Sequence, residues 1–269
     1  MGQVGFRQFL KPVQPTVRLQ QEVGYTEVVP ETRLEPFIYC YWQLKSEFRL
    51  PAPFFYRVIP DGCVDIFFNV NDAQDCRIMG FSTIPMEFML PHSFHYAGIR
   101  FLPGAFPLLF DLDVSSLTDR DEGLDIVIPK AAKQLRDVVE GQTNLAKIKI
   151  LLDEYFLKKV ATADGIMDKR LYNAIMIILR EHGALNLKSE IDIGISSRQL
   201  RRLFEFYVGT SPKMFSKVIR FQYFFQLLPS AEGQGYNKIF LDAGYYDQPH
   251  FNKDFKKFFG LTPTEALRA

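Results

Sequence analysis

The chain has 269 residues, of which 47% are hydrophobic and 23% are charged, and its formal net charge is +1. This composition excludes a disordered protein, and the length suits two ordinary domains. No apolar run reaches the ~18 residues that a membrane-spanning helix needs. The N-terminal stretch MGQVGFRQFLKPVQPTVRLQ lacks the apolar core of a secretory signal. We therefore expect a cytoplasmic protein with no membrane partner.

Cysteine and histidine usage argues against metal or redox chemistry. Cys40, Cys63 and Cys76 are an odd number of cysteines without CxxC spacing, so we expect buried free thiols. His92 and His95 have the HxxH spacing of a helical metal pair, but they lie in a strand-like stretch, where residues three apart face opposite sides. We expect no metal site and no cofactor.

The part of the chain up to about Gly123 predicts a β domain. Short runs rich in aromatic and β-branched residues alternate with Pro, Gly and Asn. These runs are FIYCYWQL, FFYRVI, VDIFFNV, CRIMGF and YAGIRFL. Strands at such spacing predict an antiparallel sandwich or a small barrel.

A helical period begins at about Ile128. The stretches AAKQLRDVVEG and LAKIKILLDEYFLKK carry apolar residues three and four apart, which predicts helices that follow the β domain. A boundary near residues 161–165 precedes a segment that we expect to be helical to the end. The expected fold class is α+β, with a β domain and trailing helices over residues 1–160 and an all-α domain over residues 166–269.

The C-terminal part contains an internal repeat. Residues 196–212, SSRQLRRLFEFYVGTSP, align with residues 247–263, DQPHFNKDFKKFFGLTP. Both copies have an N-cap residue, apolar residues spaced by four, and a Gly that indicates a left-handed helix end. A short apolar segment with a Gly precedes each copy, LKSEIDIG and KIFLDAG. The pattern predicts two helix-turn-helix motifs.

The segment between the two copies predicts a linker helix. SPKMFSKVIRFQYFFQLL would form a helix of about 18 residues, or roughly 27 Å. That length is close to the ~34 Å between successive major-groove faces of B-DNA. One chain is therefore expected to place two recognition helices in successive major grooves of one duplex.

Basic and amide side chains occupy the face of each second helix that lies opposite its apolar stripe. Such side chains read base edges or hold phosphates. A single charged face is more often merely solvated, but two copies with the same cap, core and ending favour DNA binding. The predicted DNA-contacting residues are Arg198, Gln199, Arg201 and Arg202 in motif one, Lys217 and Arg220 in the linker, and Gln248, His250, Asn252, Lys253, Lys256 and Lys257 in motif two.

These stretches resemble a known family. GISSRQLRRLFEFYVGTSPKMF, VIRF and AGYYDQPHFNKDFKKFFGLTP are similar to the DNA-binding domain of the AraC family of transcription regulators, over roughly residues 166–269. CYWQL, VIPDGCVDIFFNV and GIRFLPGAF resemble the sensor half of one AraC subgroup, which implies a cupin-like β-barrel followed by helices. Ser189, Glu190 and Phe240 depart from the family pattern. The departures imply altered helix packing and, at Ser189-Glu190, weaker DNA contact by motif one.

Five residues of the β domain are candidate ligand-binding groups. Asp61, Asp65 and Arg100 could line a cavity in the barrel, with Trp42 and Tyr56 as its walls. Alternatively, Asp61-Gly62 makes a turn and Arg100 forms a structural ion pair with one of the aspartates. The sequence alone favours the structural pair.

The sequence thus predicts a DNA-binding transcription regulator rather than an enzyme. Its partners would be double-stranded DNA, a small-molecule effector, a second copy of the chain and, for an activator, RNA polymerase. No phosphate loop, nucleophile elbow or HExxH motif is present, and Asp247 and His250 lack a nucleophile. The alternatives are a cupin-type metalloenzyme or DNA-repair protein with an appended helix-turn-helix, and an interaction module whose DNA face has decayed.

Overall fold

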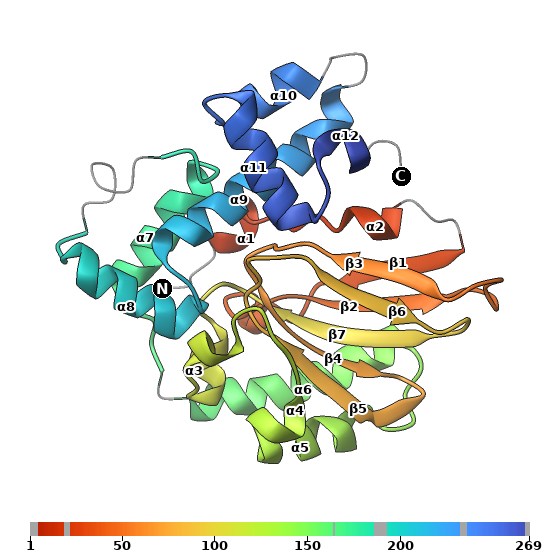
Figure 1. The fold of residues 1–269 in the computed structure, drawn as a ribbon. Helices are drawn as coiled ribbons and strands as arrows, with labels where there is room; N and C mark the ends of the chain where they lie inside the picture. Colours follow the sequence, from red (N-terminus) through yellow and green to blue (C-terminus); the bar gives the residue numbers. More distant parts are fainter. Residues whose placement is uncertain (1–4, 19–21, 164, 186–192, 232–235, 267–269) are drawn as a thin grey trace.

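Two antiparallel sheets face each other in the first half of the chain (Figure 1). The computed structural model describes residues 5–18, 22–163, 165–185, 193–231 and 236–266. A six-stranded sheet has the order β1-β2-β7-β4-β5-β8, and β3 pairs with β6. The strands are β1 (Val23–Val28), β2 (Ile38–Ser46), β3 (Phe54–Val58), β4 (Val64–Asn69), β5 (Asp72–Met79), β6 (Met86–Leu90), β7 (His95–Phe101) and β8 (Asp121–Gly123). The predicted antiparallel β domain is confirmed, and each of the five predicted runs overlaps a strand.

Strands β1, β6 and β8 have no counterpart in the sequence prediction. The β1 stretch VGYTEV contains a Gly and a charged residue, and the β6 stretch MEFML alternates between half-buried and exposed side chains. Their pairing is supplied by neighbours: β1 pairs with β2, and β6 pairs with β3. Strand propensity depends on such cross-strand packing, so these segments carry only a weak local signal.

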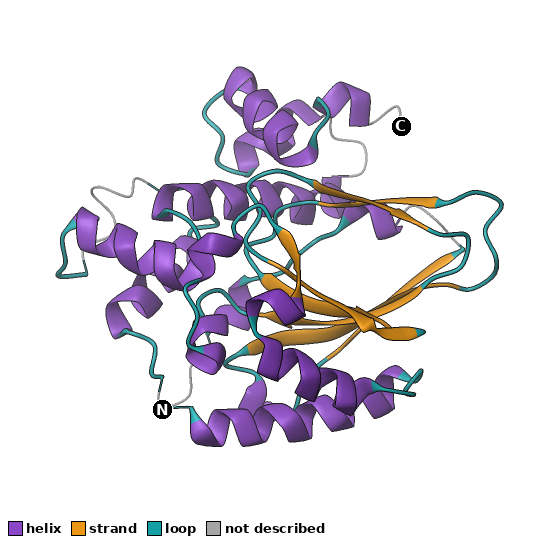
Figure 2. Cartoon of the chain, turned by 60° about the horizontal axis from the view of Figure 1, so that its bottom comes forward, coloured by secondary structure: helices purple, strands orange, loops and turns teal. Residues whose placement is uncertain are grey.

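Helices cover the outer face of the larger sheet, and more helices lie on the opposite side of the strands (Figure 2). The predicted trailing helices are α5 (Pro129–Val139) and α6 (Leu145–Thr162), with the shorter α3 (Phe106–Phe110) and α4 (Leu124–Val127) before them. Strand alternation divides β4 between two environments. Ile66 and Phe68 pack in the core beneath these helices, whereas Asp65 and Phe67 face β3 and β6. None of the described helices is long and apolar enough to cross a membrane.

The C-terminal half contains the predicted repeat. Helices α8 (Ser197–Val208) and α11 (Gln248–Phe259) are both 12 residues long. Ser196 and Asp247 cap them by accepting the backbone N–H groups of Gln199 and His250. Each ends at a glycine with φ of 89°, Gly209 and Gly260. The caps and endings predicted from the sequence are confirmed.

The remaining helices of this half surround the linker. They are α7 (Lys169–Arg180), the linker α9 (Pro212–Leu227), α10 (Tyr236–Asp242) and α12 (Pro263–Ala266). The linker has 16 residues where about 18 were expected, because a 3-10 turn over Leu228–Ala231 follows it. The predicted first helix of motif one, with Ser189 and Glu190, falls largely outside the described residues. Phe240 is accommodated by stacking on Phe251, with ring centroids 5.5 Å apart.

The two halves of the chain share one hydrophobic core. Helix α9 contributes Phe215, Phe221 and Phe224 to a cluster that also contains Ile59 and Phe81 of the β domain. The sequence predicted a boundary between two domains at residues 160–166. Side chains from both sides of that boundary pack in this one core, so the division into two domains stays a prediction.

The sequence did not predict two N-terminal helices, and the segment that contains them enters this core through Phe6, Leu10 and Val13. They are α1 (Phe6–Phe9) and α2 (Pro15–Arg18), and Phe6 stacks on Tyr172 of α7 at 4.7 Å. Buried Gln222 of α9 accepts the N–H of Val13 at 2.7 Å and donates to the carbonyl of Pro60 at 2.7 Å. The N-terminal segment is thus fastened between the β domain and α9.

The Gln222 contacts predict a large effect of one substitution on stability. Gln222→Ala is expected to lower the free energy of unfolding by about 1–3 kcal/mol, because the N–H of Val13 and the carbonyl of Pro60 lose their partner. Gln226 lies one turn further along α9, is partly exposed and donates to the Lys11 carbonyl at 2.9 Å. Gln226→Ala is the matched control, with an expected change of about 0.5 kcal/mol or less. Urea unfolding measures both, and equal effects would contradict the prediction.

Candidate nucleic-acid interface and ligand pocket

The face of α8 opposite its buried Leu200 and Phe204 is exposed. Gln199 accepts the N–H of its cap, Ser196, at 3.1 Å, and Arg201 pairs with Glu205 on the same helix at 2.7 Å. Arg198 and Arg202 have no hydrogen-bond or ion-pair partner within the described parts of the chain. These two guanidinium groups are therefore available to an external ligand.

Helix α11 also presents a basic face. Gln248, Lys253, Lys256 and Lys257 are exposed, and His250 and Asn252 are half-buried. Lys253 and Lys256 make no ion pair with any described carboxylate, and the Nζ of Lys257 lies 3.9 Å from the sulfur of Met214. The Nε2 of His250 is 3.5 Å from buried Asp254. Each of the six predicted residues of motif two thus lies outside the buried stripe of this helix.

Lys217 and Arg220 of the linker turn toward the interior of the domain. The Nζ of Lys217 donates to buried Asp254 at 2.8 Å. Arg220 donates to the Gly183 carbonyl at 2.7 Å and lies over the ring of Tyr245. These contacts join α9 to α11 and to the end of α7. The sequence analysis did not anticipate such internal partners, because helical periodicity does not show that α9 is enclosed on most of its sides.

The N-terminal domain borders motif one. A 3-10 helix over Val114–Leu117 lies beside α8, and the Thr118 hydroxyl donates to the carbonyl of Gly209 at the end of α8. A cleft of about 500 Å³ lies between α8 and this turn, with Asp113, Gln199 and Arg202 among its lining residues. Helix α8 is thus in direct contact with the N-terminal half of the chain.

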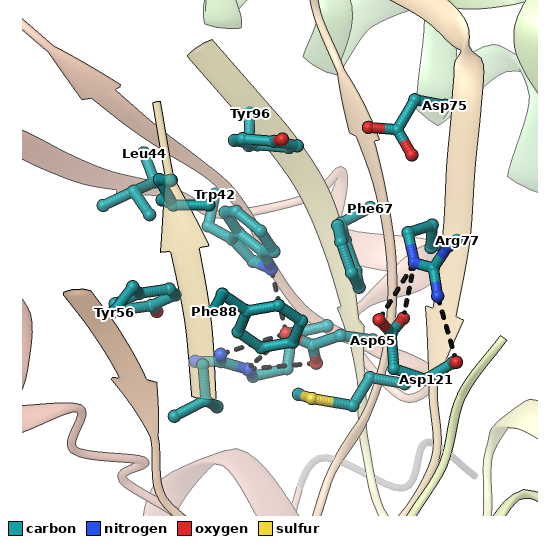
Figure 3. Close-up of a pocket in the computed structure, with 14 residues that line it drawn as sticks. Trp42, Leu44, Tyr56, Asp65, Phe67, Asp75, Arg77, Phe88, Tyr96 and Asp121 are labelled. Atoms are coloured by element: carbon teal, nitrogen blue, oxygen red, sulfur yellow. Dashed lines mark hydrogen bonds and ion pairs between the residues drawn. The ribbon is translucent and has the colours of Figure 1, made fainter. Parts of the chain in front are cut away.

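Four of the five predicted ligand residues line one pocket between the two sheets: Trp42, Tyr56, Asp65 and Arg100 (Figure 3). Its volume is about 100 Å³. Asp61 lies outside the lining, where it accepts the amide of Gln14 at 3.1 Å and lies 3.6 Å from Arg100. The structure therefore brings the predicted group together, with Asp61 behind the pocket wall.

Arg100 is both a pocket residue and a member of a buried ion pair. Its Nη2 lies 3.0 Å from Asp65, and both side chains are 3% exposed. Trp42 donates its indole N–H to the same carboxylate at 3.0 Å. Burial raises the pKa of Asp65 to about 6, although the Arg100 charge opposes the shift. Arg100 thus forms the expected structural ion pair and also lines the pocket, and its role in ligand binding stays a prediction.

Several pocket residues were missed by the sequence analysis. Phe67, Asp75, Arg77, Phe88, Tyr96 and Asp121 also line the pocket. Phe67 could have been predicted from the sequence, because it lies two residues after Asp65 on the same strand and its side chain therefore points to the same face of the sheet. Phe88 belongs to β6, which was not predicted. Arg77 and Asp121 meet only through the pairing of β5 with β8.

The three cysteines and His92 lie in the β domain. Cys40, Cys63 and Cys76 are buried free thiols, and burial raises the pKa of each. His92 Nδ1 lies 2.9 Å from the Leu50 carbonyl, so it serves the backbone of the β domain. Within the described ranges, no group of three or more His, Cys, Asp or Glu side chains is arranged to hold a metal ion.

Two family models match separate parts of the chain. A helix-turn-helix domain model matches residues 192–269, and a domain of unknown function, DUF6597, matches residues 26–122. The chain is 29% identical over 140 residues to an uncharacterized HTH-type transcriptional regulator of Haemophilus influenzae, a match that covers 50% of this chain and 46% of that protein. It is 26% identical over 222 residues to the uncharacterized HTH-type transcriptional regulator YidL of Escherichia coli, covering 77% of this chain and 72% of YidL. The match thus spans about half the length of the first relative.

Solved structures of ToxT from Vibrio cholerae align with 91% of this chain and 97% of their own length. The identity is 13%, and the TM-scores are 0.39 and 0.33. Scores this low do not establish a shared site or function.

The placement of Lys217 predicts a role in stability. Lys217→Met is expected to lower the free energy of unfolding by about 1–3 kcal/mol, because Asp254 stays buried without its counter-charge. Lys213 is exposed on the same helix, so Lys213→Met is the control and is expected to change stability by about 0.5 kcal/mol or less. Thermal unfolding of both variants tests this, and an unchanged Lys217→Met protein would contradict it.

Proposed function

We propose that this chain, which belongs to the AraC family of helix-turn-helix proteins, is a sequence-specific regulator of transcription that binds double-stranded DNA in the cytoplasm. One observation carries the proposal: α8 and α11 repeat the same cap, buried stripe and glycine ending, and each exposes a basic face. Membership of this family argues against the metalloenzyme and DNA-repair alternatives.

Base readout is assigned to the outer faces of the two repeated helices. Arg198, Gln199 and Arg202 would read one major groove, and His250, Asn252 and Lys253 the next. Gln248 and Arg201 flank these sets. Helix α9 holds the two motifs apart with 16 residues, or about 24 Å. Lys256 and Lys257 would bind phosphates, whereas Lys217 and Arg220 are proposed to hold the motifs in place.

The N-terminal domain is proposed to bind a small-molecule effector in the pocket between the sheets. A ligand there changes DNA binding only if it favours one arrangement of the two halves. Contacts from Arg100 to Asp61, from Asp61 to Gln14 and from Val13 to Gln222 link the pocket wall to α9. Further proposed partners are a second copy of the chain, through the N-terminal domain, and RNA polymerase for an activator.

The double substitution Arg198→Ala, Arg202→Ala is expected to weaken binding to an operator selected from random DNA at least about tenfold. Each bidentate contact to a base contributes about 1–3 kcal/mol. Arg201→Ala is the control and should have a smaller effect, because Arg201 is already paired with Glu205. Fluorescence anisotropy with labelled operator measures all three proteins. Wild-type affinity in the double variant would exclude motif one as a reader.

Salt dependence separates phosphate contacts from structural lysines. Lys256→Ala and Lys257→Ala are each expected to reduce the slope of log K against log salt concentration by about 1. Lys217→Met, over the range of salt concentrations in which it remains folded, should leave the slope unchanged, because the ammonium group of Lys217 pairs with Asp254 in the wild type. Titrations of operator binding over a range of salt concentrations give the slopes. A reduced slope for Lys217→Met would place that lysine at the DNA.

A further inference from the structure

Five aromatic rings form the walls of the pocket between the sheets. They belong to Trp42, Tyr56, Phe67, Phe88 and Tyr96, which come from five different strands (Figure 3). Neighbouring ring centroids are 6.2 Å apart for Trp42 and Phe67, 6.3 Å for Phe67 and Phe88, and 6.4 Å for Phe67 and Tyr96. Rings so arranged leave about 100 Å³ of free space between them. The arrangement is that of an aromatic cage.

The charged groups of the pocket favour a cation over an anion. Arg100 is paired with Asp65 at 3.0 Å, and Arg77 is paired with Asp121 at 2.9 Å. Asp75 has no hydrogen-bond or ion-pair partner in the described part of the chain and lies at the same end of the pocket as Tyr96 (Figure 3). Both guanidinium groups are thus neutralised by carboxylates, and one carboxylate is left over. An anionic ligand would meet no unpaired positive charge.

The ring faces of the cage are not used by cations of the protein. The cation–π contacts among the described residues lie elsewhere, for example between Arg57 and Phe259 and between Arg220 and Tyr245. Aromatic faces carry partial negative charge, and several rings around one site attract a desolvated cation. The rings that turn a face toward the free space therefore act in the same direction as Asp75.

The volume limits the size of the group that is bound. A cavity of about 100 Å³ is smaller than the ~300 Å³ at which sites for drug-sized ligands begin. It is closer to the ~150 Å³ engineered cavity that accepts benzene, a molecule of six heavy atoms. A primary ammonium group would lose its water for a single free carboxylate, whereas a quaternary ammonium group has no N–H to satisfy. A trimethylammonium group suits both the size and the lining.

We propose that the pocket is an aromatic cage for a small quaternary ammonium ligand, with Asp75 as its counter-charge. The proposal names the chemical class of the effector and so rests on the effector site proposed above. Its test uses the full-length protein without DNA, so that it is independent of operator binding.

Choline is the probe, and the fluorescence of Trp42 is the readout. Trp42 is the single tryptophan of the chain, so its emission reports on the wall of the cage. Choline is expected to change this emission in a saturable way. The neutral alcohol in which carbon replaces the choline nitrogen has the same shape, and we expect it to bind at least about tenfold more weakly. Acetate, the anionic control, is expected not to bind.

Matched variants separate the contribution of the Tyr96 ring to choline binding from that of the Asp75 charge. Tyr96→Leu is expected to weaken choline binding about tenfold, whereas Tyr96→Phe retains the ring face and should bind as wild type does. Asp75→Asn should weaken the binding of choline but not that of the neutral alcohol. Thermal unfolding without ligand establishes that each variant is folded.

Three outcomes overturn the cage: no binding of choline, equal binding of choline and its neutral analogue, or preferential binding of acetate. Measuring operator binding with the same protein preparation distinguishes failure of the cage proposal from failure of the proposed DNA-binding function. Lost choline binding with intact operator binding refutes only the ligand class. Intact choline binding without operator binding refutes only the DNA-binding role.

Discussion

The burial of helix α9 is the constraint on which the arrangement of this protein depends. A helix on a protein surface needs only one apolar stripe. Helix α9 buries Phe215, Val218, Phe221, Phe224 and Phe225, and even Ser216 and Gln222. Phe215 packs on Phe204 of motif one, and Phe221 packs on Phe255 of motif two. Gly62 of the β domain approaches the same Phe215 so closely that a β-carbon there would lie 3.2 Å from its ring. One helix thus holds three parts of the molecule in contact.

Because α9 is enclosed, its buried polar side chains need hydrogen-bond or ion-pair partners. A buried amide or ammonium group is tolerated only where it finds a partner, since burial without one costs free energy. Gln222 therefore bonds to Val13 and Pro60, and Lys217 to Asp254. The same groups that make α9 compatible with burial also hold the N-terminal segment and motif two against it.

The ends of both repeated helices contact the N-terminal domain. Thr118 bonds to Gly209 at the end of α8, and Arg57 of β3 lies over the ring of Phe259 at the end of α11. Strand β3 alternates, so Tyr56 faces the pocket while Arg57 faces α11. A ligand that displaces Tyr56 would therefore act on the strand that contacts motif two. The pocket and the end of α11 are thus joined through the packed strand β3.

Local features of the sequence determined a large part of this protein. The caps at Ser196 and Asp247 and the endings at Gly209 and Gly260 depend on chemistry within one helical turn, so they were predictable. The exposed basic faces follow from helical periodicity for the same reason. Asp65 was named as a candidate pocket residue from its side-chain type, and it lies in the pocket lining.

Tertiary structure alone decided the rest, because the deciding contacts join distant segments. The pairing of Arg77 with Asp121 needs β8, and the assignment of Phe88 to the pocket needs β6, whose local signals are weak. Lys217 and Arg220 look like surface residues in the sequence, and only the enclosure of α9 gives them internal partners. This difference between what the sequence predicts and what only the fold decides has a physical cause. Caps, turns and periodicity are interactions between near neighbours in the chain, whereas a pocket and a buried linker are made by side chains that only the complete fold brings together.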